Sequence, residues 1–372
     1  MIIAVPREAA EKERRVALVP ETVSRFAKMG VAVCVQRGAG NAAAFPDELY
    51  GAAGASSAED AQSLVAEADV VVSVGRPGEE VLSGLRPGCV VVGFLNPLGD
   101  PAYLQRLAEA NVTAIAMETI PRITRAQSMD ALSSQSNIAG YKAVLLAAAH
   151  LPKFFPMLTT AAGTIAPAKV LVLGAGVAGL QAIATARRLG AVVSGYDVRA
   201  AVKEQVQSLG ATFLEFELGA DAETAGGYAK ELTAEQQERQ RGWMVEQIGA
   251  NDVVITTALV PGRKAPVLIS EAGVAAMKPG SVVIDLAAEA GGNCALTVRD
   301  ELVTSANGVT VVGTTNLPST MPSDASRLYS RNIYALLSPW IADGKLTIDP
   351  DDEVAKGAVV ARDGNVLVGA GQ

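Results

Sequence analysis

The chain has 372 residues, of which 49% are apolar, and it carries a net charge of −8. This length exceeds what one hydrophobic core usually serves, so we expect two domains. The negative charge argues against nucleic-acid binding and against direct docking on an anionic membrane. Three scattered cysteines without a CxxC pattern are typical of reduced residues in a cytosolic compartment, and we expect no metal site.

Apolar runs that predict strands alternate with helical patterns along the chain. The first set of strands is expected at 2–5, 31–36, 70–74, 89–94 and 112–117. The second set is expected at 170–173, 192–196, 212–216, 252–257, 282–286 and 309–313. This alternation predicts an α/β fold with two doubly wound, Rossmann-like domains built on parallel sheets. We expect neither a signal peptide nor a segment that inserts into a membrane.

The domain boundaries are expected at a helical segment, 134–150, and at the chain after 318. The segment would leave the first domain for the second, and the later chain would return to the first. The predicted domains are 1–133 with 319–372, and 134–318. The one long irregular insertion, 219–241, contains Gly226-Gly227-Tyr228, which favours a mobile lid over a disordered loop.

A stretch rich in hydrogen-bonding groups, 121–137, follows a predicted strand and precedes the helical segment. Four of its side chains would be available to a ligand at one loop-to-helix junction: Arg122, Gln127, Asp130 and Ser133. In the structural alternative, Ser133 or Ser134 caps the helix and Arg122 pairs with Asp130. The residues alone leave both interpretations open.

The most informative motif lies within 170–197, where an apolar run meets a glycine-rich turn, an amphipathic helix and a second apolar run. The glycines allow a tight turn, close approach of a pyrophosphate and close packing of the helix, whose N-terminus attracts anions. This order predicts a dinucleotide site in the second domain. The expected contacts are Gly174, Gly176, Val177, Ala178, Gly179, Asp197, Val198 and Arg199.

Asp197 ends the second apolar run, close to the spacing of about 20 residues at which an acidic residue binds the adenosine ribose. Its carboxylate would repel a 2′-phosphate, because two unit charges about 4 Å apart repel by about 4 kcal/mol near a protein surface. The sequence therefore favours NAD over NADP. Arg199 keeps the other choice open, because an arginine can neutralise such a phosphate.

The chain has a single histidine, His150, at a helix end where an imidazole commonly satisfies terminal carbonyls. Oxidation of an alcohol or amine requires a base, whereas hydride transfer between two nicotinamide rings moves only a C–H hydrogen. The scarcity of histidine favours the second chemistry. Glu289, within the stretch 285–293 at the carboxyl end of a predicted strand, is either a loop acid or a nicotinamide contact.

Together these stretches resemble the NAD(H)-binding component, domain I, of proton-translocating nicotinamide nucleotide transhydrogenases, almost end to end. The resemblance is densest over 121–144, 168–191, 197–211, 224–231, 255–269 and 277–293. It implies that Arg122, Gln127, Asp130 and Ser133 hold the nicotinamide end, with Gln127 reaching towards the second nucleotide. It also implies that Tyr228 lies on a loop that closes over NAD(H).

The resemblance further implies a cytoplasmic homodimer that binds NAD(H) in the cleft between its domains. Hydride would pass directly to NADP(H) on a separate subunit, and a membrane subunit would couple this transfer to proton movement. The chain would then lie peripherally on the inner face of the membrane, held there by its partners. The non-enzymatic alternative is an NAD-responsive binding module.

The chain also resembles alanine dehydrogenases, over 14–23 and 38–40. Where those enzymes have a catalytic lysine and a catalytic histidine, this chain has Arg76 and Asn96, and Glu289 replaces an aspartate. Neither a guanidinium nor an amide accepts a proton near neutral pH. Amino-acid dehydrogenation is therefore the alternative that the sequence disfavours.

Overall fold

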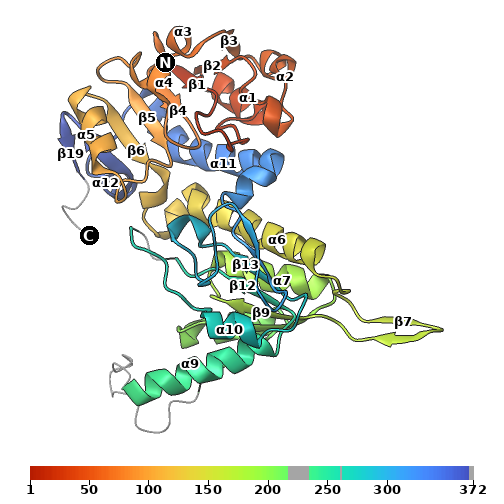
Figure 1. The fold of residues 1–372 in the computed structure, drawn as a ribbon. Helices are drawn as coiled ribbons and strands as arrows, with labels where there is room; N and C mark the ends of the chain where they lie inside the picture. Colours follow the sequence, from red (N-terminus) through yellow and green to blue (C-terminus); the bar gives the residue numbers. More distant parts are fainter. Residues whose placement is uncertain (217–233, 260–261, 368–372) are drawn as a thin grey trace. The chain divides into compact units, whose positions relative to one another are not determined.

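The computed structural model describes residues 1–216, 234–259 and 262–367 (Figure 1). The chain divides into two compact units. The first unit comprises Met1–Ser136 and Pro318–Gln372, and the second comprises Asn137–Leu317. The boundary between them falls inside one long helix, α6 (Ala131–His150).

The first unit is built on a sheet whose strands follow the order β19-β18-β6-β5-β4-β1-β2-β3 in the described chain. The strands from β1 to β6 run parallel to their neighbours, and β18 and β19 add an antiparallel edge. Their bounds are β1 (Ile2–Val5), β2 (Ala32–Gln36), β3 (Ser56–Ala58), β4 (Val70–Val72), β5 (Val90–Gly93), β6 (Thr113–Ala116), β18 (Val359–Arg362) and β19 (Asn365–Val366).

Helices cover both faces of this sheet, because successive strand residues point to opposite sides. In β1, Ile3 joins one hydrophobic cluster and Ala4 joins the other. The first cluster is covered by α1 (Pro20–Lys28), α2 (Asp47–Ala52), α11 (Pro322–Leu337) and α12 (Glu353–Ala358). The second is covered by α3 (Ala61–Val65), α4 (Glu79–Leu82) and α5 (Pro101–Glu109).

The second unit has a sheet of order β11-β10-β9-β12-β13-β15-β14 in its described residues, parallel except for the edge strand β14. The strands are β9 (Lys169–Leu173), β10 (Val192–Tyr196), β11 (Thr212–Phe213), β12 (Val253–Thr256), β13 (Val282–Asp285), β14 (Leu302–Thr304) and β15 (Thr310–Val312). Helices α6, α7 (Val177–Arg188) and α8 (Lys203–Ser208) pack on one face. Helices α9 (Ala234–Gly249) and α10 (Glu271–Ala276) pack on the other.

Shorter elements complete the two units. A hairpin of β7 (Leu158–Thr160) and β8 (Gly163–Ile165) extends away from the sheet of the second unit (Figure 1). The first unit holds a second small ribbon, β16 (Ile341–Ala342) and β17 (Lys345–Leu346). The 3₁₀ turns are η1 (Asn41–Ala43), η2 (Met117–Thr119), η3 (Thr124–Met129), η4 (Ala200–Val202), η5 (Ala288–Ala290), η6 (Leu317–Thr320) and η7 (Ser338–Trp340).

The α/β fold with two sheets is confirmed, while two details differ from prediction. The sheets carry antiparallel edges, because β14, β18 and β19 are short strands without the continuous apolar run of a central parallel strand. The predicted irregular insertion, 219–241, is wrong over 234–241, where α9 begins. Its earlier part lies outside the described residues. Over the described chain, we find no helix long and apolar enough to cross a bilayer.

Candidate nucleotide site

The glycine motif forms the turn between β9 and α7, as its sequence predicts. Gly174 follows β9 with a φ of +100°, which side chains rarely adopt. A Cβ on Gly179 would lie 1.8 Å from the carbonyl oxygen of Gly174, so only glycine allows the helix this close to the turn. The strand-to-helix connection therefore depends on glycine at two positions for reasons internal to the protein.

Gly176 has no such internal reason. A Cβ on it would meet no protein atom within 4 Å, and its backbone lies in the extended region at the N-cap of α7. The space beside it is therefore open to a ligand that needs close contact with the backbone. A pyrophosphate is such a ligand, and the residues fit it.

The N-terminus of α7 adds donors and a positive dipole end to this open space. No side chain of the described residues caps the helix, and the first backbone bond within it joins the N–H of Leu180 to the carbonyl of Gly176. The N–H groups of Val177, Ala178 and Gly179 precede that bond and have no partner inside the helix. This arrangement attracts an anion.

Asp197 lies beside the glycine turn, just past the end of β10. Its Oδ2 accepts from the N–H of Ala175 at 2.8 Å, and its Oδ1 accepts from the N–H of Arg199 at 2.9 Å. The guanidinium of Arg199 donates to both carboxylate oxygens at 2.9 Å. Burial alone would raise the pKa of Asp197, but the hydrogen bonds from Arg199 and Ala175 outweigh it, so this pKa is lowered.

The ion pair explains how Asp197 and Arg199 share the adenosine end. Four donors occupy the carboxylate in this structure, so ribose hydroxyls would exchange with the guanidinium. Arg199 is 59% exposed at its side chain and has room to move aside. Val198, between them, is 85% exposed and makes no contribution to the core.

The carboxyl ends of β12 and β13 join the glycine turn through a buried polar network. Thr257 donates from its hydroxyl to the carbonyl of Gly174 at 3.1 Å. The next residue, Ala258, donates its N–H to the side-chain oxygen of Asn293 at 3.0 Å. Asp285, fully buried at the end of β13, accepts from the N–H of Asn293 at 2.7 Å. Ligands of such sheets bind at this edge.

Glu289 and Tyr228 are the remaining predicted residues of the second unit. Glu289 lies in η5, exposed, on the loop that Asp285 and Asn293 anchor, and its role stays a prediction. Tyr228 lies outside the described residues.

The predicted polar loop of the first unit leads through η3 into α6. Arg122 and Gln127 are exposed, and neither side chain makes a hydrogen bond or ion pair with the rest of the described chain. Asp130 instead holds the helix start, because it accepts from the N–H of Ser133 at 2.8 Å and from its hydroxyl at 2.6 Å. Two side chains are thus available to a ligand, and two are joined to each other.

This geometry corrects the structural alternative for the loop. The N-terminal cap is Asp130, not Ser133 or Ser134, because its carboxylate reaches the free N–H three residues on. Within the described residues, Arg122 forms no ion pair with Asp130. Ser134 lies in the first turn of α6, where its hydroxyl donates to the side-chain oxygen of Asn332 at 2.7 Å.

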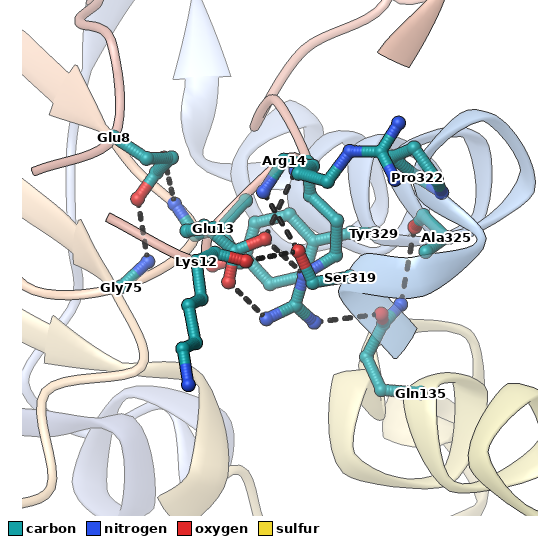
Figure 2. A network of polar contacts seen from close by, with 12 residues as sticks. Glu8, Lys12, Glu13, Arg14, Gly75, Gln135, Ser319, Pro322, Ala325 and Tyr329 are labelled. Atoms are coloured by element: carbon teal, nitrogen blue, oxygen red, sulfur yellow. Dashed lines mark hydrogen bonds and ion pairs between the residues drawn. The ribbon is translucent and has the colours of Figure 1, made fainter. Parts of the chain in front are cut away.

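The sequence interpretation missed a buried polar network behind this loop (Figure 2). Glu8 accepts from the N–H groups of Val74 and Gly75 at 2.6 and 2.9 Å. Arg15 is 7% exposed and donates to Glu13 and to Gln135. No spacing rule connects these residues, and the signal available in the sequence was charge placed within an otherwise apolar region.

Glu8 has the most perturbed carboxyl group of this network. Burial raises its pKa to about 7, against the opposing effect of its two backbone hydrogen bonds. Nearby, the carbonyl of Ser73 accepts from the hydroxyl of the fully buried Tyr329 at 2.7 Å. A network of this kind fixes the backbone around it because each group needs its partners.

Arg76 and Asn96 lie at the carboxyl edge of the first sheet. The guanidinium of Arg76 donates to Asp100 at 2.7 Å and to the carbonyl of Leu95 at 2.8 Å. Asn96 has a φ of +51°, and its N–H donates to Glu118. Both residues thus stabilise local structure, and neither offers a base.

Comparison with known proteins gives matches over nearly the whole chain. Residues 4–139 match the family description "Alanine dehydrogenase/PNT, N-terminal domain", and residues 143–369 match "Alanine dehydrogenase/PNT, C-terminal domain". An NAD(P) transhydrogenase alpha subunit from Rhodospirillum rubrum is 48% identical over 99% of this chain and 98% of its own length.

Solved structures and more distant relatives agree with this assignment. A transhydrogenase crystal structure from Sinorhizobium meliloti superimposes with a TM-score of 0.86 at 41% identity, covering 99% of both chains. The alanine dehydrogenase of Bacillus subtilis is 31% identical over 87% of this chain and 81% of its own length. The similarity to the transhydrogenases is thus greater in both identity and coverage.

Proposed function

Because the chain belongs to the alanine dehydrogenase/PNT family, we propose that it is the NAD(H)-binding subunit of a nicotinamide nucleotide transhydrogenase. It binds NAD(H) and works with a partner subunit that binds NADP(H). Hydride passes directly between the two nucleotides, with Re/Si specificity. The relatives named as transhydrogenase subunits, which align over 99% of the chain, support this choice within the family.

The observation that carries the proposal is the contrast between Gln127 and the side chains around it. Gln127 is exposed and without a described partner, on a loop whose other polar groups are engaged in holding the backbone. An amide can orient a nicotinamide but cannot take a proton. Direct hydride transfer requires orientation alone, so the residue suits the reaction.

The chain's own residues have the following roles in this proposal. Gly176 and the N-terminus of α7 bind the pyrophosphate, and Asp197 binds the adenosine ribose. Arg122 and Gln127 orient the nicotinamide end, while Asp130 and Ser133 keep their loop in place. Tyr228 would close over the nucleotide. NAD(H) supplies the hydride chemistry, and the protein supplies position.

Assembly and membrane coupling belong to the same proposal. The chain forms a homodimer and joins a membrane subunit that couples hydride transfer to proton translocation, which places it peripherally on the cytoplasmic face. The relatives are named as alpha subunits, and this supports the presence of partner subunits. Exposed Phe154 and Met157, beside the β7–β8 hairpin, support self-association, because large exposed apolar side chains gather at interfaces.

Reconstitution tests the function. The purified chain is mixed with the NADP(H)-binding subunit of a related transhydrogenase, and reduction of an NADP⁺ analogue by NADH is followed by absorbance. We expect turnover with both proteins and none with either alone. NADH formation from L-alanine and NAD⁺ by the chain alone would instead support an amino-acid dehydrogenase. Tight NADH binding without transfer in the mixture would indicate a binding module.

A further inference from the structure

Asn332, on α11, connects the two ends of the segment that carries the predicted nicotinamide contacts. Its side-chain amide donates to the carbonyl of Ser128 at 2.8 Å. Its side-chain oxygen accepts from the hydroxyl of Ser134 at 2.7 Å. Asp130 lies between these two attachment points, and Gln127 immediately precedes the first. Asn332 is 7% exposed, so water competes little for either hydrogen bond.

Gln135 adds a second link between α11 and the start of α6. Its amide donates to the carbonyl of Ala325 at 3.1 Å, as Figure 2 shows. Its side-chain oxygen accepts from Arg15 at 2.9 Å, and Arg15 is in turn paired with Glu13 at 2.6 Å. The first turn of α6 is therefore held on its buried side by residues from two other parts of the first unit.

The loop ahead of that turn has few other attachments. Ala126 and Met129 are buried in the apolar core, while Gln127 and Ser128 are exposed. The backbone bond from the N–H of Asp130 to the carbonyl of Gln127 is long, at 3.4 Å. The hydrogen bond from Asn332 to the carbonyl of Ser128 is thus a main polar restraint on the backbone next to Gln127.

We propose that Asn332 is a positioning residue for hydride transfer, which holds the backbone at Ser128 so that Gln127 orients the nicotinamide. This inference rests on the proposed function. Its effect acts through Gln127 and not through contact with the nucleotide. Hydride transfer is sensitive to such placement, because a 1 Å displacement of reacting groups can reduce a rate by about 100-fold.

Asn332→Asp tests the link, because aspartate keeps the acceptor for Ser134 and loses the donor to Ser128. Ser330→Ala is the matched control: its hydroxyl, on the same helix and buried, accepts from the N–H of Val19 at 3.1 Å, away from the loop. Each change removes one buried hydrogen bond of α11. With the NADP(H)-binding subunit present, we expect Asn332→Asp to lower the single-turnover transfer rate at least tenfold. NADH affinity should change less than twofold, and Ser330→Ala should change neither.

Hydrogen exchange of the chain without its partner reads the positioning directly. In Asn332→Asp, amides of 124–130 should exchange at least tenfold faster, whereas Ser330→Ala should leave them unchanged. Ser134→Ala removes the other hydrogen bond of Asn332 without introducing a charge, and should give a smaller change in the same direction. Equal rates and equal exchange in Asn332→Asp and the control would overturn the proposal. A wild-type chain that transfers no hydride would overturn the proposed function instead, and the exchange result would still stand.

Discussion

The two predicted ends of the nucleotide site are constructed in different ways. In the second unit, the pyrophosphate side consists of backbone: a glycine turn, the N-terminus of α7 and the acid that follows β10. In the first unit, the nicotinamide side consists of side chains on a loop that distant residues hold in place. The first construction is local and shows in the sequence, and the second depends on tertiary structure.

The largest expected effect comes from the backbone construction. Gly179→Ala places a Cβ 1.8 Å from the carbonyl of Gly174, so the turn must shift away from its present position. We expect NADH affinity to fall at least 100-fold, measured by calorimetry, and the free energy of unfolding to fall by about 1–3 kcal/mol. Gly242→Ala, in α9, is the control, because its Cβ would meet nothing within 4 Å. Equal behaviour of the two variants would contradict the packing argument.

The next effect separates orientation from binding. Gln127→Asn shortens the side chain by one methylene and keeps its amide. We expect hydride transfer with the partner subunit to slow about 50-fold, while NADH affinity changes less than threefold, because misplacement affects the transfer step most. Gln105→Asn, on the exposed face of α5, is the matched control. If the Gln127 variant loses affinity and rate equally, its role is only to bind the nucleotide.

The buried network behind the loop predicts a pH dependence. The pKa of Glu8 is raised to about 7, so its contribution to folding is fully present below the ordinary pKa of 4.5 and is lost as pH rises towards and beyond 7. Between pH 5 and 8 this loss amounts to about 2 kcal/mol. Denaturant unfolding of the wild type should therefore show that decrease relative to Glu8→Gln, which keeps an acceptor and does not titrate. A constant difference between the two proteins across this range would exclude the assignment.

The smallest effect concerns nucleotide choice. Arg199→Ala removes the guanidinium that occupies Asp197 and would neutralise a 2′-phosphate. We expect the preference for NADH over NADPH to rise about threefold, measured as a ratio of dissociation constants. Asp197→Ala should lower the same ratio. A ratio that moves in the same direction in both variants would remove this pair from the selectivity.

Sequence reasoning succeeded where a residue's role depends on its immediate neighbours. Gly174 and Gly179 are identifiable because a strand, a turn and a helix follow one another within a few residues. Asp130 shows the limit: its capping role was assigned to Ser133 or Ser134, because all three positions precede or begin the same helix. Asn332 was not predictable, since its bond to Ser128 spans 204 positions.

The edges of the sheets teach the same lesson. The central strands have apolar runs on both faces and were predicted, whereas β3 is short and largely exposed, and its pairing with β2 depends on the tertiary arrangement. The helix α9 was interpreted as loop because its sequence is rich in glutamine, glutamate and arginine, with little apolar periodicity. Contacts of Trp243 with Tyr196 and Phe216 anchor it to the sheet instead.

The central claim is that this protein works by placing one nicotinamide against another, without a proton-transferring side chain. NADH deuterated at the transferred position, with the chain, its NADP(H)-binding partner and NADP⁺ in ordinary water, tests it most directly. We expect the NADPH formed to carry the deuterium in full and none to appear in the solvent. NADPH labelled from water, or deuterium released to it, would contradict direct transfer.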